Sequence, residues 1–587
     1  MRRLVLLGLL GLGACKEEPP VVEPPEECPA PSSQALPTSA RALTASTVSS
    51  SHLSGPEEDG REPVLVRFRP STGVHAAALR EERVARVGGK VKYHWPRLGL
   101  LAARLSPEAR EALARDPELL SIEQDHRVHA LGSPNPSGHP GEYTQAVKRV
   151  QAPEVWDANG DGMLDPGAPT GEGIKVCVID SGIDDRHPEL KAAYVPGQGF
   201  GKDFIDGDDD PKDQAASGMW GSGHGTHVAG IIAAQLGMGG RVGTQDATLH
   251  PNGMVGAAPG ATLLIARVLD TGGSGSMSNV IEALGWCQQQ GARIVSLSLG
   301  TPRSSDAMQA AFDAAWANGV ISVAASGNAG NNNPSAPPPV IYPAAYPNVI
   351  AVGAVDAEDQ HPTFSQTGEH LRLVAPGVDV LSATVLGEPF SEVEACGVQY
   401  PSVGLKYSGL GEYTGPLIDC GQAPDSISCA SGTPDGFVAY VESGPQLLGD
   451  TVRKVQEQGA HAVIISNTDP TQQEYLFTLG GPGVWPPVVA VPGVTGKELA
   501  KRVGLPARVG LMGLDYTRRT GTSMATPYVS AVAALVWSAR PSLTHIQVRD
   551  LLERSAKDLG PAGRDPTFGF GLVQAKAALE LSTSLTP

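Results

Sequence analysis

The 587-residue sequence is poor in charged residues and has no basic run interleaved with aromatic residues. Charged residues make up only 18% of the chain, whereas glycine (71) and proline (50) are abundant. This composition is typical of a loop-rich extracellular enzyme and argues against a coiled coil or a disordered scaffold. The formal net charge of −18 and the missing basic run argue against nucleic acid as a partner. A chain of this length is expected to contain several domains.

The N-terminus lacks a hydrophobic run long enough to span a bilayer, and so does the rest of the sequence. Residues 1–3 are basic and residues 4–12 are apolar, which predicts a secretory signal peptide over residues 1–14. The small residues before Cys15 resemble the bacterial lipobox, which implies cleavage before Cys15 and lipidation of its sulfur. The alternative is a free cysteine after an ordinary signal peptide. Residues 15–60 are rich in Pro, Glu, Ser and Ala and are predicted to be a disordered tether.

Residues 61–131 carry the pattern of a small separate domain. Four strands are predicted, over residues 64–68, 90–95, 100–105 and 119–124. Helices are predicted over residues 74–87 and 107–115, the second of them capped by Ser106. The order is that of a split βαβ unit, which on pattern alone fits any small binding module.

Ser523 lies at the start of a helix that is apolar all round, over residues 528–537. Such a helix is predicted to be buried. A hydroxyl at its positive end, among N–H groups without intrahelical partners, can stabilise a developing oxyanion. The alternative is a simple helix cap.

Asp180 ends an apolar run over residues 174–179, as expected of a buried parallel strand that carries an acid at its carboxyl end. The alternative is a turn-forming aspartate. His224 and His227 follow in a histidine-rich motif whose spacing could suggest a metal pair. No Glu or His stands near them at the spacing of a zinc motif.

Three stretches together resemble the subtilisin family in both residue and order. They are Asp180 in Asp-Ser-Gly, His224 in His-Gly-Thr-His-Val-Ala-Gly, and Ser523 in Gly-Thr-Ser-Met-Ala-Thr-Pro. The resemblance extends over nearly all of residues 60–580. It implies an α/β fold with a mostly parallel sheet flanked by helices. The catalytic domain is expected in two parts, residues 146–384 and 515–587.

The resemblance also implies the role of each active-site residue. Ser523 is expected to be the nucleophile, His224 the general base and then the general acid, and Asp180 the residue that orients the imidazole. Asn328, in Ala-Ala-Ser-Gly-Asn, is expected to donate to the oxyanion, the alternative being a turn residue. No cofactor is expected for the chemistry. The residues expected to bind the substrate backbone are Ser298, Leu299, Gly300 and Gly327.

Residues 61–131 resemble the inhibitory propeptide of the same family. This implies a tail that lies in the active site until the enzyme cuts it, followed by a linker over residues 132–145. If Leu131 precedes the cut, Val128 occupies the fourth subsite, and both residues predict apolar pockets. We therefore expect broad specificity for protein or peptide substrates, with an apolar preference.

Residues 385–514 interrupt the family pattern and resemble a protease-associated (PA) domain, expected to be β-rich and noncatalytic. Its implied role is access control or protein contact. Within it, Cys420 and Cys429 lie on one loop, where a disulfide is predicted. Cys177 and Cys287 stand in apolar segments and are predicted to be buried thiols.

A run of oxygen-bearing side chains at alternate positions resembles the first half of an EF-hand calcium loop. The position of the usual twelfth-residue Glu is taken by Ala168, so structural calcium and a simple polar turn both stay open. The four expected ligands are Asp157, Asn159, Asp161 and Asp165.

The sequence thus predicts a secreted, self-processing serine endopeptidase, expected to be a monomer. Because Cys15 lies on the propeptide side of the cut, only the precursor is expected to be membrane-anchored, through its lipid. The mature enzyme is expected outside the cytoplasm, either released after the cut or held by its noncovalently bound propeptide until that is degraded. There are two competing hypotheses. One is a noncatalytic surface lipoprotein that has an inactive protease fold. The other is an esterase, although the usual Gly-x-Ser-x-Gly motif of esterases is missing here.

Overall fold

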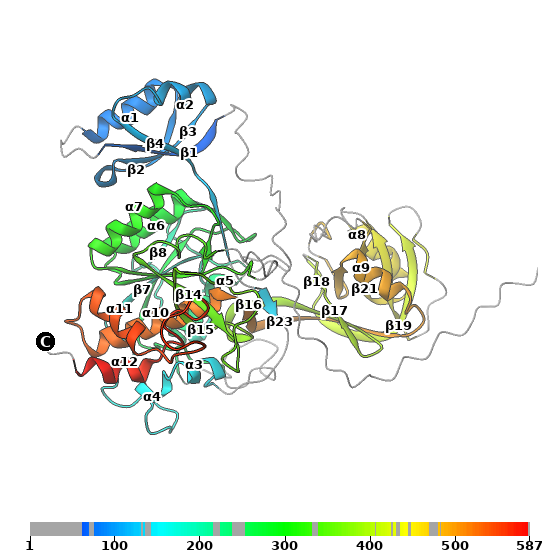
Figure 1. Ribbon diagram of the computed structural model, residues 1–587. Coiled ribbons are helices and arrows are strands. Elements are labelled where there is room, and N and C mark those ends of the chain that lie inside the picture. The colour runs from blue at the N-terminus through cyan, green and yellow to red at the C-terminus, as the bar shows by residue number, and fades with distance from the viewer. Residues whose placement is uncertain are drawn as a thin grey trace, which may run out of the picture.

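A computed structural model describes most of the chain from residue 61 onward (Figure 1). The described residues are 61–69, 76–130, 133–135, 142–214, 223–236, 253–330, 339–405, 407–423, 427–429, 435–443, 448–468, 479–481 and 483–584. The predicted signal peptide, Cys15 and the predicted tether lie outside them. Among these residues, no helix is long and apolar enough to cross a membrane.

The largest unit is built on a seven-stranded sheet in which every neighbouring pair of strands is parallel. Buried, nearly continuous apolar strands of this kind require helices on both faces, as predicted. In the order found across the sheet, the strands are β15 (Leu371–Pro376), β14 (Val349–Val355), β13 (Ile321–Ala325), β11 (Ile294–Leu297), β7 (Lys175–Asp180), β9 (Thr262–Arg267) and β8 (Gly201–Asp203).

Helices cover both faces of this sheet (Figure 1). One hydrophobic core joins the sheet to α5 (His224–Ala233) and α10 (Thr522–Ala539), and the other joins it to α6 (Met277–Gln289) and α7 (Asp306–Ala317). All residues of α10 through Trp537 are buried, which explains its lack of a polar face. The remaining helices of this unit are α3 (Gln145–Arg149), α4 (Pro153–Trp156), α11 (His545–Arg554) and α12 (Ala575–Ser582).

The N-terminal unit has the predicted order of strands and helices, with its own apolar core. Ser106 caps α2, since its side chain accepts a hydrogen bond from the Ala109 N–H at 3.2 Å. The antiparallel sheet has the order β2-β3-β1-β4. The elements are β1 (Glu62–Phe68), α1 (Ala76–Arg86), β2 (Lys90–Trp95), β3 (Leu100–Leu105), α2 (Pro107–Leu113) and β4 (Leu119–Gln124).

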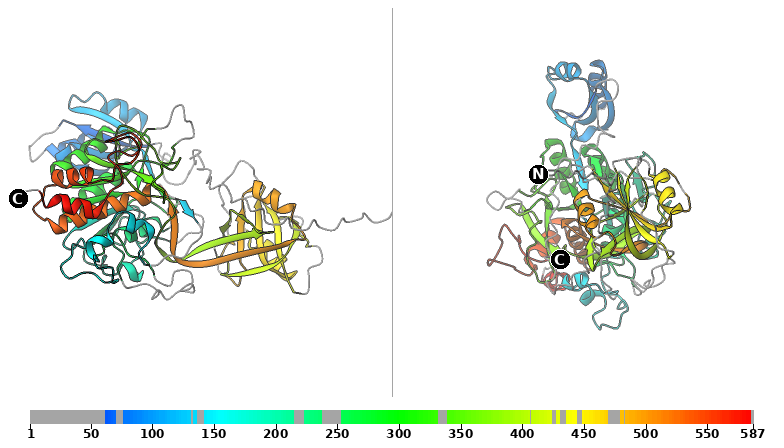
Figure 2. Two further views of the ribbon diagram at one scale, coloured as in Figure 1. Left: turned by 60° about the horizontal axis from the view of Figure 1, so that its bottom comes forward. Right: turned by 90° about the vertical axis from the view of Figure 1, so that its right-hand side faces the viewer.

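The insertion stands away from the large unit on two long antiparallel strands, β16 (Val380–Ala395) and β23 (Pro506–Thr520) (Figure 2). Beyond this stalk, four strands run parallel and one is antiparallel, so the insertion is itself partly an α/β layer rather than only β-rich. These elements are β18 (Val403–Gly404), β19 (Gly411–Gln422), β20 (Phe437–Ser443), α8 (Gly449–Glu457), β21 (Ala460–Asn467), β22 (Val488–Val491) and α9 (Gly493–Ala500); the short strand β17 (Val398–Tyr400) extends the stalk.

One cysteine prediction is wrong. Cys177 on β7 and Cys287 on α6 are joined in a disulfide, with 5.9 Å between their Cα atoms, and are not separate buried thiols. The bond closes a loop over 110 residues, for which chain entropy predicts roughly 4–5 kcal/mol of stabilisation. The disulfide ties α6 to β7, three residues before Asp180.

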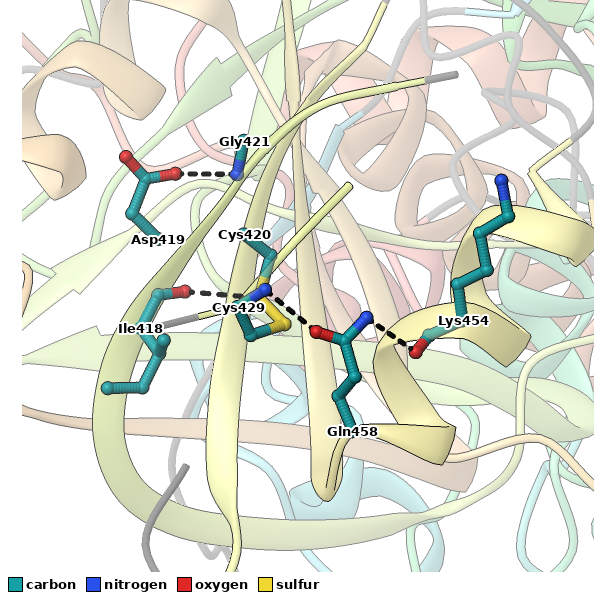
Figure 3. The surroundings of a disulfide bond; sticks show 7 residues. All are labelled: Ile418, Asp419, Cys420, Gly421, Cys429, Lys454 and Gln458. Atoms are coloured by element: carbon teal, nitrogen blue, oxygen red, sulfur yellow. Dashed lines mark hydrogen bonds between the residues drawn. A yellow bond between two sulfur atoms is a disulfide. The ribbon is translucent and has the colours of Figure 1, made fainter. Parts of the chain in front are cut away.

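The second disulfide joins Cys420 and Cys429 within the insertion, where the sequence predicts one. It lies beside the end of α8 (Figure 3). The Cys429 N–H donates to the Gln458 side-chain oxygen at 2.9 Å, and the Gln458 amide donates to the Lys454 carbonyl at 3.0 Å. Cys429 is therefore held both covalently and by a hydrogen bond at the end of a helix.

Candidate active site

Asp180 and His224 meet at the carboxyl edge of the parallel sheet. Asp180 is the last residue of β7, and His224 is the first residue of α5. His224 Nδ1 lies 2.7 Å from Asp180 Oδ1, and both side chains are buried. A buried carboxylate at this distance holds the proton on Nδ1 and leaves Nε2 as the basic nitrogen.

A second carboxylate, Asp213, supports the start of α5. The helix begins after Gly223, which has no side chain to cap it. Asp213 instead accepts hydrogen bonds from the Thr226 hydroxyl at 2.7 Å, the Thr226 N–H at 3.0 Å and the Gly223 N–H at 3.2 Å. Burial raises the pKa of Asp213 to about 7. Sequence reasoning missed this residue, because an acid eleven positions before His224 carries no local helix-cap signal.

Ser523 is the second residue of α10, as its sequence context predicts. Its hydroxyl donates to the Ser298 carbonyl at 3.0 Å, while the Ser298 hydroxyl donates to the Ser523 carbonyl at 2.7 Å. Among the described residues, the buried His224 Nε2 has no hydrogen-bond partner. The hydroxyl must therefore turn from Ser298 toward His224 before His224 can accept its proton, and catalytic hydrogen bonds often tighten only with substrate bound.

Asn328 is joined to the start of α10 through Thr522. Asn328 Oδ1 accepts from both the N–H and the hydroxyl of Thr522, each at 2.9 Å. With its oxygen occupied in this way, the side chain can offer only N–H donors to a ligand. Thr522 was not singled out by sequence reasoning, although it stands in the Gly-Thr-Ser motif.

The described segments on either side of residues 131 and 132 are short strands that pair with strands next to this site. Strand β5 (Arg127–Ala130) pairs antiparallel with β10 (Ser274–Ser276) on one side and β12 (Leu299–Gly300) on the other. Strand β6 (Ser133–Asn135) pairs with Arg518–Thr520 of β23. Leu131 and Gly132 lie between the two, outside the described residues.

The predicted backbone-binding residues Leu299 and Gly300 thus pair with β5, opposite Ala130 and His129. Ser298 instead contacts Ser523, and Gly327 lies beside Asn328 with φ +114°. Val128 is fully buried, in one core with residues of the large unit and of the N-terminal unit. This burial agrees with an apolar pocket at its position.

Carboxylates of the N-terminal unit lie at the starts of two helices in the large unit. Asp125 accepts hydrogen bonds from the Ser278 N–H, at 2.9 Å, and the Ser278 hydroxyl. Glu123 accepts from the Ala307 N–H at 3.2 Å. Burial raises the pKa of Asp125. Negative charge at a helix N-terminus is favourable, so both contacts hold this unit on α6 and α7.

The calcium-like loop is held by its own backbone. Asp157 accepts from the Asp161 N–H at 3.0 Å, the Gly162 N–H at 3.0 Å and the Tyr143 hydroxyl at 2.5 Å. The Tyr143 hydrogen bond contributes most to lowering the pKa of Asp157. Asp165 accepts from the Ala158 N–H at 2.7 Å. Within the described ranges, no three His, Cys, Asp or Glu side chains form a metal-binding group. The oxygen chemistry suits calcium, but these contacts also account for a polar turn.

Comparison with known proteins gives consistent matches. The family described as "Subtilase family" matches residues 171–407 and 429–571. An alkaline protease of Alkalihalobacillus alcalophilus is 33% identical over 377 residues, covering 62% of this chain and 84% of its own. Subtilisin E of Bacillus subtilis (strain 168) is 32% identical over 339 residues, covering 58% and 77%. A solved structure of a psychrophilic subtilisin-like protease from Pseudoalteromonas sp. AS-11 is 29% identical, covers 76% of this chain and 99% of its own, and has a TM-score of 0.45.

Proposed function

Because the chain belongs to the subtilase family and is a serine endopeptidase, we propose that Asp180, His224, Ser523 and Asn328 carry out its peptide-bond hydrolysis. The observation that carries this proposal is the buried 2.7 Å contact between Asp180, at the end of β7, and His224, at the start of α5. The membership argues against the two competing hypotheses, a noncatalytic lipoprotein and an esterase.

In this mechanism, His224 Nε2 takes the proton of the Ser523 hydroxyl as Ser523 Oγ attacks the substrate carbonyl carbon. The resulting oxyanion accepts hydrogen bonds from Asn328 Nδ2 and the Ser523 N–H. His224 then gives its proton to the leaving amine, and the peptide C–N bond breaks to leave an acyl-enzyme. A water, deprotonated by His224, hydrolyses the ester and restores Ser523.

We propose that residues 61–131 are an inhibitory propeptide and that the enzyme makes the cut itself. The antiparallel pairing of β5 with β10 and β12 supports this, since an extended substrate would bind in the same way. The pairing of β6 with β23 supports a cut between residues 130 and 133. The carboxylate contacts of Glu123 and Asp125 would keep the propeptide bound after cleavage.

Mass spectrometry of the N-terminus, applied separately to membrane and medium fractions, tests these proposals. We expect a mature chain that starts at Gly132, recovered from the medium, and a precursor that starts at a lipidated Cys15 in the membrane. A mature start outside residues 131–133 would contradict the cut position, and an unmodified Cys15 would contradict the lipidation. Mature enzyme that stays in the membrane after loss of the propeptide would contradict release.

We infer that the insertion at residues 385–514 is a PA domain that controls substrate access or contacts proteins. Its stalk is held close to α5, the helix that begins with His224, because His227 on α5 lies within hydrogen-bond distance of the Val380 and Thr517 carbonyls. Removing the domain beyond the stalk is expected to alter hydrolysis of folded proteins more than that of short peptides. Equal effects on both would count against this role.

Structural calcium stays a prediction for the loop at Asp157, Asn159, Asp161 and Asp165. Calcium added to the metal-free enzyme is expected to raise the melting temperature, because an ion that binds only the folded state stabilises it. The double variant D157N/D161N is expected to lose this response. If wild type and variant melt identically with and without calcium, the loop is a polar turn.

A further inference from the structure

The segment that carries Asn328 is irregular and needs support from outside itself. The segment follows the end of β13 at Ala325. In the described part of the chain, the Asn328 side chain is held only through its oxygen, by Thr522. An oxyanion donor must lie 2.7–3.1 Å from the oxyanion to be effective. The position of the Asn328 backbone therefore sets how well its amide can donate.

Gln366, in the connection between β14 and β15, contacts the residues on both sides of Asn328. Its backbone N–H donates to the Gly327 carbonyl at 3.0 Å. Its side-chain oxygen accepts from the Ala329 N–H at 3.1 Å, and its side-chain N–H group donates to the Pro339 carbonyl at 2.5 Å. Gln366 is only 2% exposed, so these hydrogen bonds are shielded from water.

The Gln366 side chain also packs closely against Gly327. A Cβ atom added to Gly327 would lie 2.0 Å from the Gln366 side-chain oxygen, so a side chain at this position would displace the Gln366 amide. Gly330 is fixed by the same loop, because its N–H donates to the Phe364 carbonyl at 2.8 Å. The loop before β15 therefore holds residues 327–330 through hydrogen bonds to Gly327, Ala329 and Gly330.

From these contacts we propose that Gln366 is a positioning residue for the oxyanion hole, acting through Asn328. The proposal rests on the role of Asn328 given above. The chemistry of the contacts calls for an amide: the oxygen must accept from Ala329, and the nitrogen must donate to Pro339. A carboxylate would accept but not donate, and would bring a negative charge toward the oxyanion. An alanine would supply neither contact.

The test is a double-mutant cycle on the full chain, with hydrolysis of a chromogenic peptide anilide as the readout. Variants N328A, Q366A and N328A/Q366A are compared with wild type. We expect N328A to lower kcat by about 100- to 1,000-fold. Q366A is expected to lower kcat by about tenfold and to leave KM unchanged within about twofold. The reason is that the Asn328 amide would no longer be held where it donates best to the oxyanion. In the N328A background, Q366A should change kcat by less than about twofold, because the residue through which it acts is gone.

Two further variants keep the result interpretable. Q360A is the matched control, because Gln360 is an exposed glutamine in the same connection, and it should leave kcat unchanged. Q366E retains the size of the side chain and is expected to lower kcat at least as much as Q366A; melting curves establish that each variant is folded. If N328A leaves kcat unchanged, the oxyanion assignment itself fails. If N328A lowers kcat but Q366A lowers it equally in both backgrounds, or affects only KM or the melting temperature, the positioning role of Gln366 is overturned.

Discussion

Replacing Ser523 by alanine is expected to lower peptide hydrolysis by about a million-fold and to leave the precursor uncut. The substitution removes the atom that attacks the carbonyl, while the hydroxyl is not needed for the burial of α10. Residual hydrolysis should still exceed the reaction in water, because Asn328 and substrate binding persist. Gel analysis of the expressed chain and hydrolysis of a chromogenic peptide measure the two effects.

The matched control is S530A, the same substitution two turns further along α10. The Ser530 hydroxyl bonds to the Ser296 hydroxyl at 3.0 Å and lies in the interior of the helix rather than at its start. S530A is expected to be processed and active. Normal processing of S523A in a host without extracytoplasmic proteases would refute self-cleavage by Ser523, and full activity of S523A on peptides would refute its role as nucleophile.

Replacing Asp180 by asparagine is expected to lower kcat by about 10⁴-fold, with a much smaller change in KM. In the wild-type protein, the Asp180 carboxylate accepts a hydrogen bond from His224 Nδ1–H at 2.7 Å. An amide that presents its N–H group there would favour the tautomer with the proton on Nε2, which cannot accept the proton of Ser523. It would also remove the negative charge that stabilises the imidazolium.

The size of the side chain is unchanged in D180N, so the loss can be assigned to chemistry if the melting temperature is retained. D209N is the matched control, because Asp209 is an exposed acid that pairs only with Lys202 in the described structure. We expect D209N to hydrolyse peptides at the wild-type rate. A folded D180N variant with more than about a tenth of wild-type kcat would contradict the proposed role of Asp180.

Several features could be predicted because their signals are local. The apolar run before Asp180 predicts a buried strand, and the all-apolar helix after Ser523 predicts a core helix. The βαββαβ order of residues 61–124 follows from hydrophobic periodicity and turn residues. Each of these depends on neighbours within about twenty residues, so the sequence contains the needed information.

Other features depend on which distant segments meet. The sequence predicts separate thiols at Cys177 and Cys287, because nothing in the chain between these positions, 110 residues apart, indicates that β7 and α6 lie side by side. The sequence predicts a β-rich insertion but not that four of its strands run parallel, because short apolar strands do not reveal the direction of their neighbours.

The sequence by itself determined which residues carry the family's motifs, because Asp180, His224 and Ser523 each stand in a short pattern of their own. Only the tertiary structure decided what holds those residues in place. Asp213 caps the catalytic helix from ten residues before Gly223, and Gln366 supports Asn328 from another loop. The physical reason is that a buried N–H or carbonyl needs a partner of matching chemistry at hydrogen-bond distance, and folding can supply that partner from any part of the chain.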